Sequence, residues 1–103
     1  MMRRSAPQGV SRVAWNQLAP FTRAVYRAVC EIPPGQTRSY QWVARRIKRP
    51  HSARAVGNAL HRNPFAPRVP CHRVVRSDGT LGGYAGGTRR KRDLLRREGS
   101  VVA

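Results

Sequence analysis

The sequence predicts a small, mainly α-helical domain with short strands, centred on a helix-turn-helix. Four segments carry apolar residues at helical spacing, and only short runs such as Val74-Val75 have the composition of strands. The two middle segments are separated by a tight break, which is the pattern of a helix-turn-helix. At 103 residues the chain has room for one domain, and it contains no internal repeat.

The first helix is predicted over residues 17–30, where an apolar face stops before the Pro-Pro-Gly turn at residues 33–35. Cys30 closes this face. A small thiol in such a position is usually a core residue, so we expect Cys30 to be buried. The other members of the face are Leu18, Phe21, Val25, Tyr26 and Val29.

The next two helices form the predicted helix-turn-helix. One is capped by Thr37 or Ser39, covers residues 40–47 and ends at a Lys-Arg-Pro break. The other covers residues 53–61 behind the N-cap Ser52, and its small residues allow its backbone to approach another surface closely. Many small helical domains contain such a pair without binding DNA, so the pattern alone leaves the function open.

Cys71-His72 is the candidate reactive pair. Prolines at positions 64, 67 and 70 fix the backbone ahead of it, and Val74-Val75 follows as a strand that can hold the thiol in place. A nucleophile needs such rigid delivery. The alternative is a core thiol, because a catalytic His is usually close to its Cys in space and not in sequence.

A glycine-rich loop follows at residues 81–87 and carries one aromatic ring, Tyr84. It has neither the Gly-Lys-Ser/Thr ending of a phosphate-binding loop nor the glycine order of a dinucleotide site. We therefore exclude nucleotide-binding functions of these two classes.

Thr88 is expected to cap a last helix over residues 89–97, which Gly99 ends. Glu98 then faces the negative end of the helix dipole, where a carboxylate is unfavourable unless a cation holds it. That partner is either a nearby arginine (Arg92, Arg96 or Arg97) on the surface or, in a catalytic interpretation, His72.

The charge balance points to a polyanionic partner. Twenty-one Lys and Arg residues against four acidic residues give a formal charge of +17. Such an excess repels itself unless a polyanion neutralises it, so nucleic acid is the expected partner. All but two of the basic residues are arginine, so an arginine-rich genome is an alternative source of part of the excess.

Residues 1–15 are expected to form a flexible basic arm and residues 16–100 the domain, with no separate N-terminal domain. Arg3 and Arg4 have no apolar run behind them, which argues against a signal peptide or a membrane segment. We expect a monomer in the cytoplasm, with no membrane partner. The two cysteines should stay unpaired there, and without zinc-type spacing around them we expect neither a metal nor a cofactor.

In order and spacing, these motifs resemble the O6-alkylguanine-DNA alkyltransferases, specifically their C-terminal active-site domain. The similarity runs from about Leu18 to Gly99 and is far more specific than a Cys-His pair. It implies a winged-helix-like helix-turn-helix DNA-binding domain of the alkyltransferase C-terminal type. The motifs are Ile32-Pro33-x-Gly35, Ser39-Tyr40, Arg54-Ala55-Val56-Gly57, Asn63-Pro64, Val69-Pro70-Cys71-His72-Arg73-Val74, Leu81-Gly82-Gly83-Tyr84-x-Gly86-Gly87 and Leu94-Leu95-x-x-Glu98-Gly99.

The resemblance implies repair of O6-alkylguanine in double-stranded DNA, once per protein molecule. Cys71 resembles the acceptor thiol, His72 the base that takes its proton through a water, and Glu98 the carboxylate that orients His72. Tyr40 would donate a proton or a hydrogen bond to the leaving guanine. Asn63 resembles the hinge residue that ties the helix-turn-helix to the active-site strand.

The resemblance also implies how DNA is bound. A thiol fixed in a pocket cannot reach a base that is stacked in a duplex, so the damaged nucleotide must be flipped out. Arg54 resembles the arginine that enters the base stack in its place, and the helix that carries Ala55 and Gly57 resembles one that enters the minor groove. Phosphate contacts are expected from Thr37, Tyr40, Arg62 and Lys91, and pocket walls from Val74, Tyr84 and Ala85.

The chain departs from the family pattern at Arg62, where a small residue is common, and at Ala66, where some members have a proline. The expected absence of an N-terminal domain makes the alkyltransferase-like proteins the main alternative. Those short proteins bind and flip alkylated guanine and flag it for another pathway, typically with Trp in place of the acceptor Cys, so Cys71 favours transfer. A plain helix-turn-helix regulator with Cys71 in its core would explain the charge but not the motifs.

Overall fold

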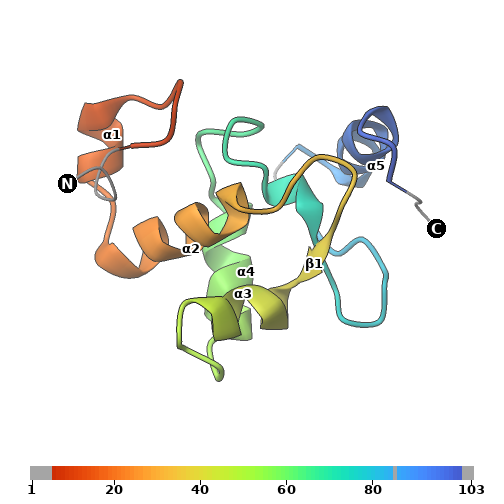
Figure 1. Ribbon diagram of the computed structural model, residues 1–103, viewed down its shortest axis with the longest axis horizontal. Coiled ribbons are helices and arrows are strands. Elements are labelled where there is room, and N and C mark those ends of the chain that lie inside the picture. Colours follow the sequence, from red (N-terminus) through yellow and green to blue (C-terminus); the bar gives the residue numbers. More distant parts are fainter. Residues whose placement is uncertain (1–5, 85, 101–103) are drawn as a thin grey trace.

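The computed structural model describes residues 6–84 and 86–100, and these fold mainly into helices with one pair of short strands (Figure 1). The predicted fold class is therefore confirmed. In chain order the elements are α1 (Arg12–Asn16), α2 (Pro20–Cys30), β1 (Arg38–Ser39), α3 (Tyr40–Arg46), α4 (Ala53–His61), a 3₁₀ turn (Cys71–Arg73), β2 (Val74–Val75) and α5 (Thr88–Arg97).

The start of the chain differs from the predicted helix over residues 17–30. α2 begins at Pro20, because proline suits the first turn of a helix, where its missing N–H is not needed. A separate helix, α1, precedes it, and the Ser11 hydroxyl caps α1 by accepting the Ala14 amide at 3.3 Å. Cys30 is exposed at the end of α2, so the expectation of a buried Cys30 is wrong.

The domain core reaches further towards the N-terminus than predicted. Trp15, which was assigned to a flexible arm, is fully buried. Its ring lies 6.4 Å from that of Tyr26 and 6.3 Å from that of Phe65, measured between centroids. The expected boundary at residue 16 therefore moves to α1, while residues 1–5 of the expected arm lie outside the described residues.

The helix-turn-helix consists of α3 and α4, and each end of α3 has a local cause. Of the two expected caps of α3, Ser39 is the cap, because its hydroxyl accepts the Trp42 amide at 2.9 Å. α3 ends at Arg46, and Lys48, two residues further on, has a left-handed φ of 64°. The amides of Lys48 and Arg49 then bond to carbonyls of the last turn of α3 at 2.9 and 2.8 Å, as in a Schellman motif.

The two strands connect the helix-turn-helix to the Cys71 segment. β1 and β2 pair in parallel, with Arg38 opposite Val74 and Ser39 opposite Val75. β1 continues directly into α3, and β2 follows directly after the 3₁₀ turn that carries Cys71. This short pairing therefore brings Tyr40, the first residue of α3, to the thiol.

The core lies where α2 packs against both α3 and α4 (Figure 1). α5 lies at the opposite end of the molecule from α1 and buries Leu94 and Leu95, as its apolar spacing predicts. Thr88 is the first residue of α5, and the capping position belongs to Gly87, so the expected Thr88 cap is wrong. No helix within the described ranges is long and apolar enough to span a membrane.

Candidate active site

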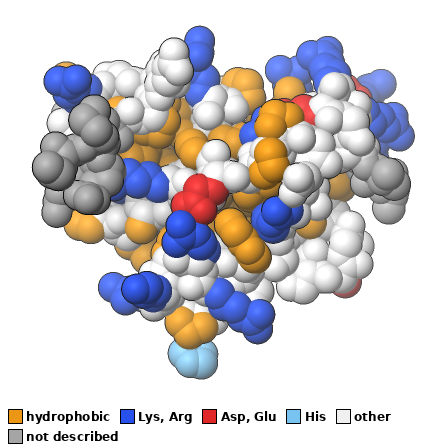
Figure 2. Space-filling model, viewed as in Figure 1, with side chains coloured by type: hydrophobic (Ala, Val, Ile, Leu, Met, Phe, Trp, Pro, Cys, Tyr) orange, Lys and Arg blue, Asp and Glu red, His pale blue; other side chains and the backbone are white. Residues whose placement is uncertain are grey.

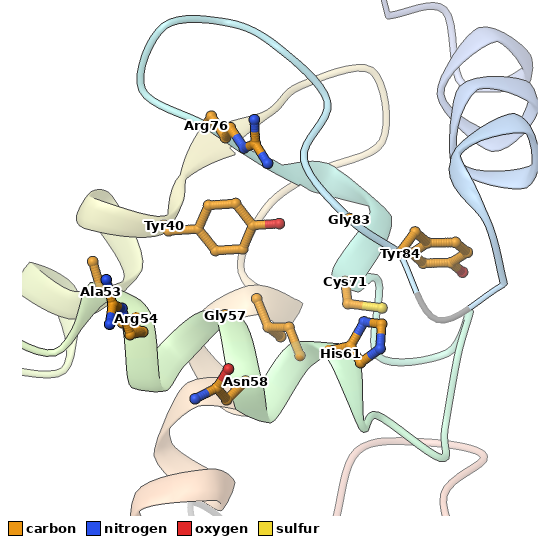
Figure 3. A pocket seen from close by; sticks show the side chains of 11 residues that line it. Tyr40, Ala53, Arg54, Gly57, Asn58, His61, Cys71, Arg76, Gly83 and Tyr84 are labelled. Atoms are coloured by element: carbon orange, nitrogen blue, oxygen red, sulfur yellow. The ribbon is translucent and has the colours of Figure 1, made fainter.

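A cavity of about 610 Å³ opens between α4 and the loop that follows β2, with Cys71 in its wall (Figure 3). We call it the main cavity. Five residues expected to form the site meet there: Tyr40, Arg54, Gly57, Cys71 and Tyr84. The sequence interpretation missed the other lining residues, which are Ala53, Asn58, Leu60, His61, Arg76 and Gly83.

Tyr40 forms the wall opposite α4. A Cβ atom at Gly82, whose φ is 73°, would stand 2.9 Å from the Tyr40 hydroxyl, so only glycine leaves room for that hydroxyl. Burial, followed by the nearby Cys71 sulfur when ionised, raises the pKa of Tyr40 above its usual value of 10.0. The phenol therefore keeps its proton at neutral pH and can donate it in a hydrogen bond.

The Cys71 thiol is buried in this wall. Burial raises its pKa, and this outweighs the opposing effects of the Asn63 amide, the Lys91 charge and the Tyr84 hydroxyl. The positive surroundings therefore do not make Cys71 a thiolate at rest. It needs a base to become a nucleophile.

Asn63 holds the segment that delivers Cys71. Its side-chain amide donates to the Val69 carbonyl at 2.8 Å, and its side-chain oxygen accepts the Phe65 amide at 2.9 Å. Because Asn63 is itself buried, these two bonds close residues 63–69 into a fixed loop immediately after α4. The loop ties the end of α4 to the Cys71 segment, and the hinge role of Asn63 stays a prediction.

His72 is placed to act as that base. Its Nε2 lies 2.9 Å from Oε2 of Glu98, and the ring is almost fully buried. A proton on Nε2, which is the tautomer that this bond requires, leaves Nδ1 as the basic nitrogen. Nδ1 is buried and has no hydrogen-bond partner among the described residues. Burial lowers the pKa of His72 below 6.5, so the ring is neutral and can accept a proton at neutral pH.

Arg73 holds Glu98, and the sequence interpretation missed it. The Arg73 guanidinium donates to both carboxylate oxygens of Glu98, at 2.9 and 2.7 Å, and its third nitrogen donates to the Ile32 carbonyl at 2.8 Å. Its bonds are the main cause of the lowered Glu98 pKa. This clamp resolves the unfavourable position of Glu98 at a helix C-terminus without the arginines of α5.

Lys91 is not a phosphate contact, which corrects the expectation. The residue is fully buried, because its ammonium points into the protein. It donates to the carbonyls of Val74 at 2.7 Å, of Gly83 at 3.2 Å and of Leu81. Lys91 thus ties α5 to β2 and to the glycine-rich loop, and burial lowers its pKa from 10.5 to about 8.

Of the other residues expected to bind DNA or line the pocket, those that the structure describes fall outside the main cavity. Val74 is a core residue and does not line it, contrary to expectation. Ala55 is exposed on α4, and Arg62 is exposed directly after it. Thr37 is half-buried next to β1, and Ala85 lies outside the described residues.

Helical spacing could have revealed two of the missed residues. Asn58 and His61 are four and seven positions after Arg54, so the expected arginine already marked their face of α4. Arg76 gave no such signal, because only the fold brings the end of β2 to the mouth of the cavity. Within residues 6–84 and 86–100, no group of three or more His, Cys, Asp or Glu residues could hold a metal ion.

Comparisons with known proteins agree with this geometry. Residues 20–100 match the family model "6-O-methylguanine DNA methyltransferase, DNA binding domain". A methylated-DNA--protein-cysteine methyltransferase of Methanosarcina mazei is 47% identical over 93 residues, which are 90% of this chain and 53% of that protein. The chain thus spans about half the length of such a relative.

Two solved structures are also similar. One is Mycobacterium tuberculosis OGT in complex with DNA, with a TM-score of 0.79 and 48% identity over 81% of this chain and 52% of that one. The other is Schizosaccharomyces pombe Atl1 with damaged DNA containing O6-carboxymethylguanine, with a TM-score of 0.73 and 39% identity over 81% of this chain and 79% of that one.

Proposed function

The chain belongs to the 6-O-methylguanine DNA methyltransferase family through its DNA-binding domain, and on this premise we propose that it repairs O6-alkylguanine in double-stranded DNA by moving the alkyl group to Cys71. One observation carries the proposal. The thiol lines a cavity of about 610 Å³, within the range of about 300–1,000 Å³ that is usual for ligand pockets. The next residue in the chain, His72, is hydrogen-bonded to Glu98.

The proposed reaction is a single substitution at carbon. His72 takes the Cys71 proton on Nδ1, through a water, and the sulfur attacks the alkyl carbon. The S–C bond forms as the C–O6 bond breaks, and the electron pair leaves with guanine. The Tyr40 hydroxyl hydrogen-bonds to the guanine as its negative charge grows. The guanine then takes up one proton from solvent while His72 releases the proton that it took from Cys71, so the protons balance. The thioether is stable, so each molecule acts once.

DNA binding is proposed to use the exposed face of α4. Arg54 lines the main cavity and is exposed, so it can enter the base stack beside a nucleotide whose base occupies that cavity. Extrusion of the base costs a few kcal/mol, which these contacts must supply. A DNA substrate implies that the protein works where the chromosomal DNA lies.

The proposal is tested by following repair of the DNA itself. A duplex whose restriction site is blocked by one O6-methylguanine is incubated with the whole chain and then digested. We expect cleavage to be restored in a 1:1 ratio to protein, with no turnover beyond that ratio. A Cys71→Ser variant should restore none, and repair by that variant would refute Cys71 as acceptor.

The similarity to Atl1 favours one alternative, in which the chain binds and flips the lesion without repairing it. Tight, lesion-selective binding by the wild-type chain with no restored cleavage would establish this alternative. The cavity-facing thiol argues against it, since a protein that only flags damage has no use for a nucleophile at that position.

A further inference from the structure

A second hollow lies on α4 beside the main cavity. It encloses about 220 Å³ and is lined by Asn58, His61 and Arg62. We call it the side hollow. Asn58 and His61 line both hollows, so the two lie next to each other at the C-terminal part of α4. Figure 3 shows both side chains extending from α4 at the main cavity.

The side hollow is chemically suited to an anion. All three lining side chains carry N–H donors, and none of them is acidic. Within the described part of the chain, none of the three side chains has a hydrogen bond or ion pair to another residue. Their donors are therefore available to a ligand.

The acidic residues do not compete for these donors. Glu31 is bound by Arg46, Glu98 by Arg73 and His72, and Asp78 by Thr80. The fourth acidic residue, Asp93, is exposed on a different helix, α5. The end of α4 does oppose an anion, since a helix C-terminus behaves as about half a negative charge. The full positive charge of Arg62 outweighs it.

The covalent link between a flipped base and its own backbone identifies the anion that would bind in the side hollow. A base that enters the main cavity brings its own sugar and phosphates to the cavity mouth. Asn58 and His61 line both the main cavity and the side hollow. A phosphate next to the flipped base therefore lies within their reach.

We propose that the side hollow is a phosphate subsite, which binds a phosphodiester next to the flipped nucleotide through Arg62, His61 and Asn58. The phosphate subsite rests on one part of the proposed function, namely that a flipped base occupies the main cavity. It gives Arg62, already expected to contact phosphate, one particular phosphate, and it adds Asn58 and His61 to the DNA-binding face.

The test couples a protein change to a DNA change. Lesion duplexes are made in which one phosphate at a time is replaced by an uncharged methylphosphonate. Their dissociation constants are measured for the full chain carrying Cys71→Ser, alone and with Arg62→Gln. The matched control is Arg97→Gln, which also removes one exposed positive charge but lies on α5.

One phosphate should respond in a distinctive way. Without Arg62→Gln, its neutralisation weakens binding by about tenfold or more, the usual size of a charged hydrogen bond. With Arg62→Gln, the unmodified duplex binds more weakly and the same neutralisation has little further effect. Arg97→Gln should keep the full response. If, at every phosphate, Arg62→Gln and the methylphosphonate raise the dissociation constant by independent factors, the subsite does not exist. The same follows if Arg62→Gln leaves the dissociation constant unchanged.

Alkyl transfer to Cys71 is measured separately from DNA binding. With Cys71 intact, Arg62→Gln should react with free O6-benzylguanine at the wild-type rate, because the free base has no phosphate. A wild-type chain that reacts with neither the free base nor lesion DNA would refute the proposed function, while the phosphate coupling would still be measurable by binding. A slowed reaction of Arg62→Gln with the free base would contradict a phosphate role.

Discussion

At the scale of single residues, one carboxylate oxygen does two tasks. Oε2 of Glu98 lies 2.9 Å from Nε2 of His72 and 2.7 Å from Arg73. The first contact fixes the imidazole tautomer that leaves Nδ1 basic, and the second keeps the carboxylate where the imidazole needs it. Arg73 is therefore a positioning residue for the proposed base.

Replacing Arg73 tests this role. Arg73→Gln should slow transfer to Cys71 severalfold. Arg73→Lys keeps a positive charge but loses the two parallel hydrogen bonds of the guanidinium, so it should restore only part of the rate. The bound arginine lowers the Glu98 pKa below 4.5, so Glu98 stabilises the fold above that pH and this stability is lost as pH falls through the lowered value.

Urea unfolding at pH 7 and at successively lower pH measures this second effect. In Arg73→Gln the loss of stability on acidification should be smaller than in wild type. An unchanged acid profile together with an unchanged rate would show that Arg73 does not position Glu98.

The Cys71 thiol gives a second residue-scale prediction. Because His72 is already neutral at pH 7 and takes the Cys71 proton in the proposed reaction, the rate of reaction with free O6-benzylguanine should stay nearly level from pH 7 up to the raised pKa of the thiol, and change only as the pH passes that pKa. Lys91→Met removes a charge that favours the thiolate and should shift the profile to higher pH. The neighbouring Arg90→Gln, on the exposed side of α5, is the control and should leave it in place.

At the scale of elements, α3 has a side-chain cap and α4 lacks one. The Ser39 hydroxyl accepts the Trp42 amide at 2.9 Å, whereas Ser52, in the capping position of α4, makes no such bond. Ser39→Ala should therefore lower the free energy of unfolding by about 1 kcal/mol, and Ser52→Ala by much less. Chemical denaturation of both variants measures the difference. Equal losses would mean that the cap does not hold the start of α3, where Tyr40 lies.

The elements also divide into those that the sequence could predict and those that it could not. α3, α4 and α5 follow from local spacing and breaks. β2 was predicted from Val74-Val75. Its pairing with β1 is only two residues long on each side and carries no periodicity, so nothing local identifies the partner strand. The Arg73–Glu98 clamp joins residues 25 positions apart and appears only once the fold exists. Lys91 was predictable in principle, because it shares a face with Leu94 and Leu95.

At the scale of the whole molecule, the positive charge is widely spread. Figure 2 shows basic side chains in several groups on this face, including one where α5 lies. Arg89, Arg90, Arg96 and Arg97 of α5 are exposed, as is Arg54 on the face of α4. DNA binding should therefore weaken steeply with salt, with a log-log slope near −5 if about six phosphates are neutralised. A titration from low to physiological salt measures the slope, and a slope near zero would contradict an electrostatic DNA interface.

The central claim is that Cys71 is the alkyl acceptor, and mass spectrometry of the protein tests it most directly. The whole chain is incubated with a duplex containing one O6-methylguanine, digested, and the peptide containing Cys71 is weighed. We predict that this peptide gains the mass of one methyl group, at most once per molecule, and that the peptide containing the exposed Cys30 gains none. An unmodified Cys71 peptide after repair of the duplex, or a methyl group on another residue, would contradict the account.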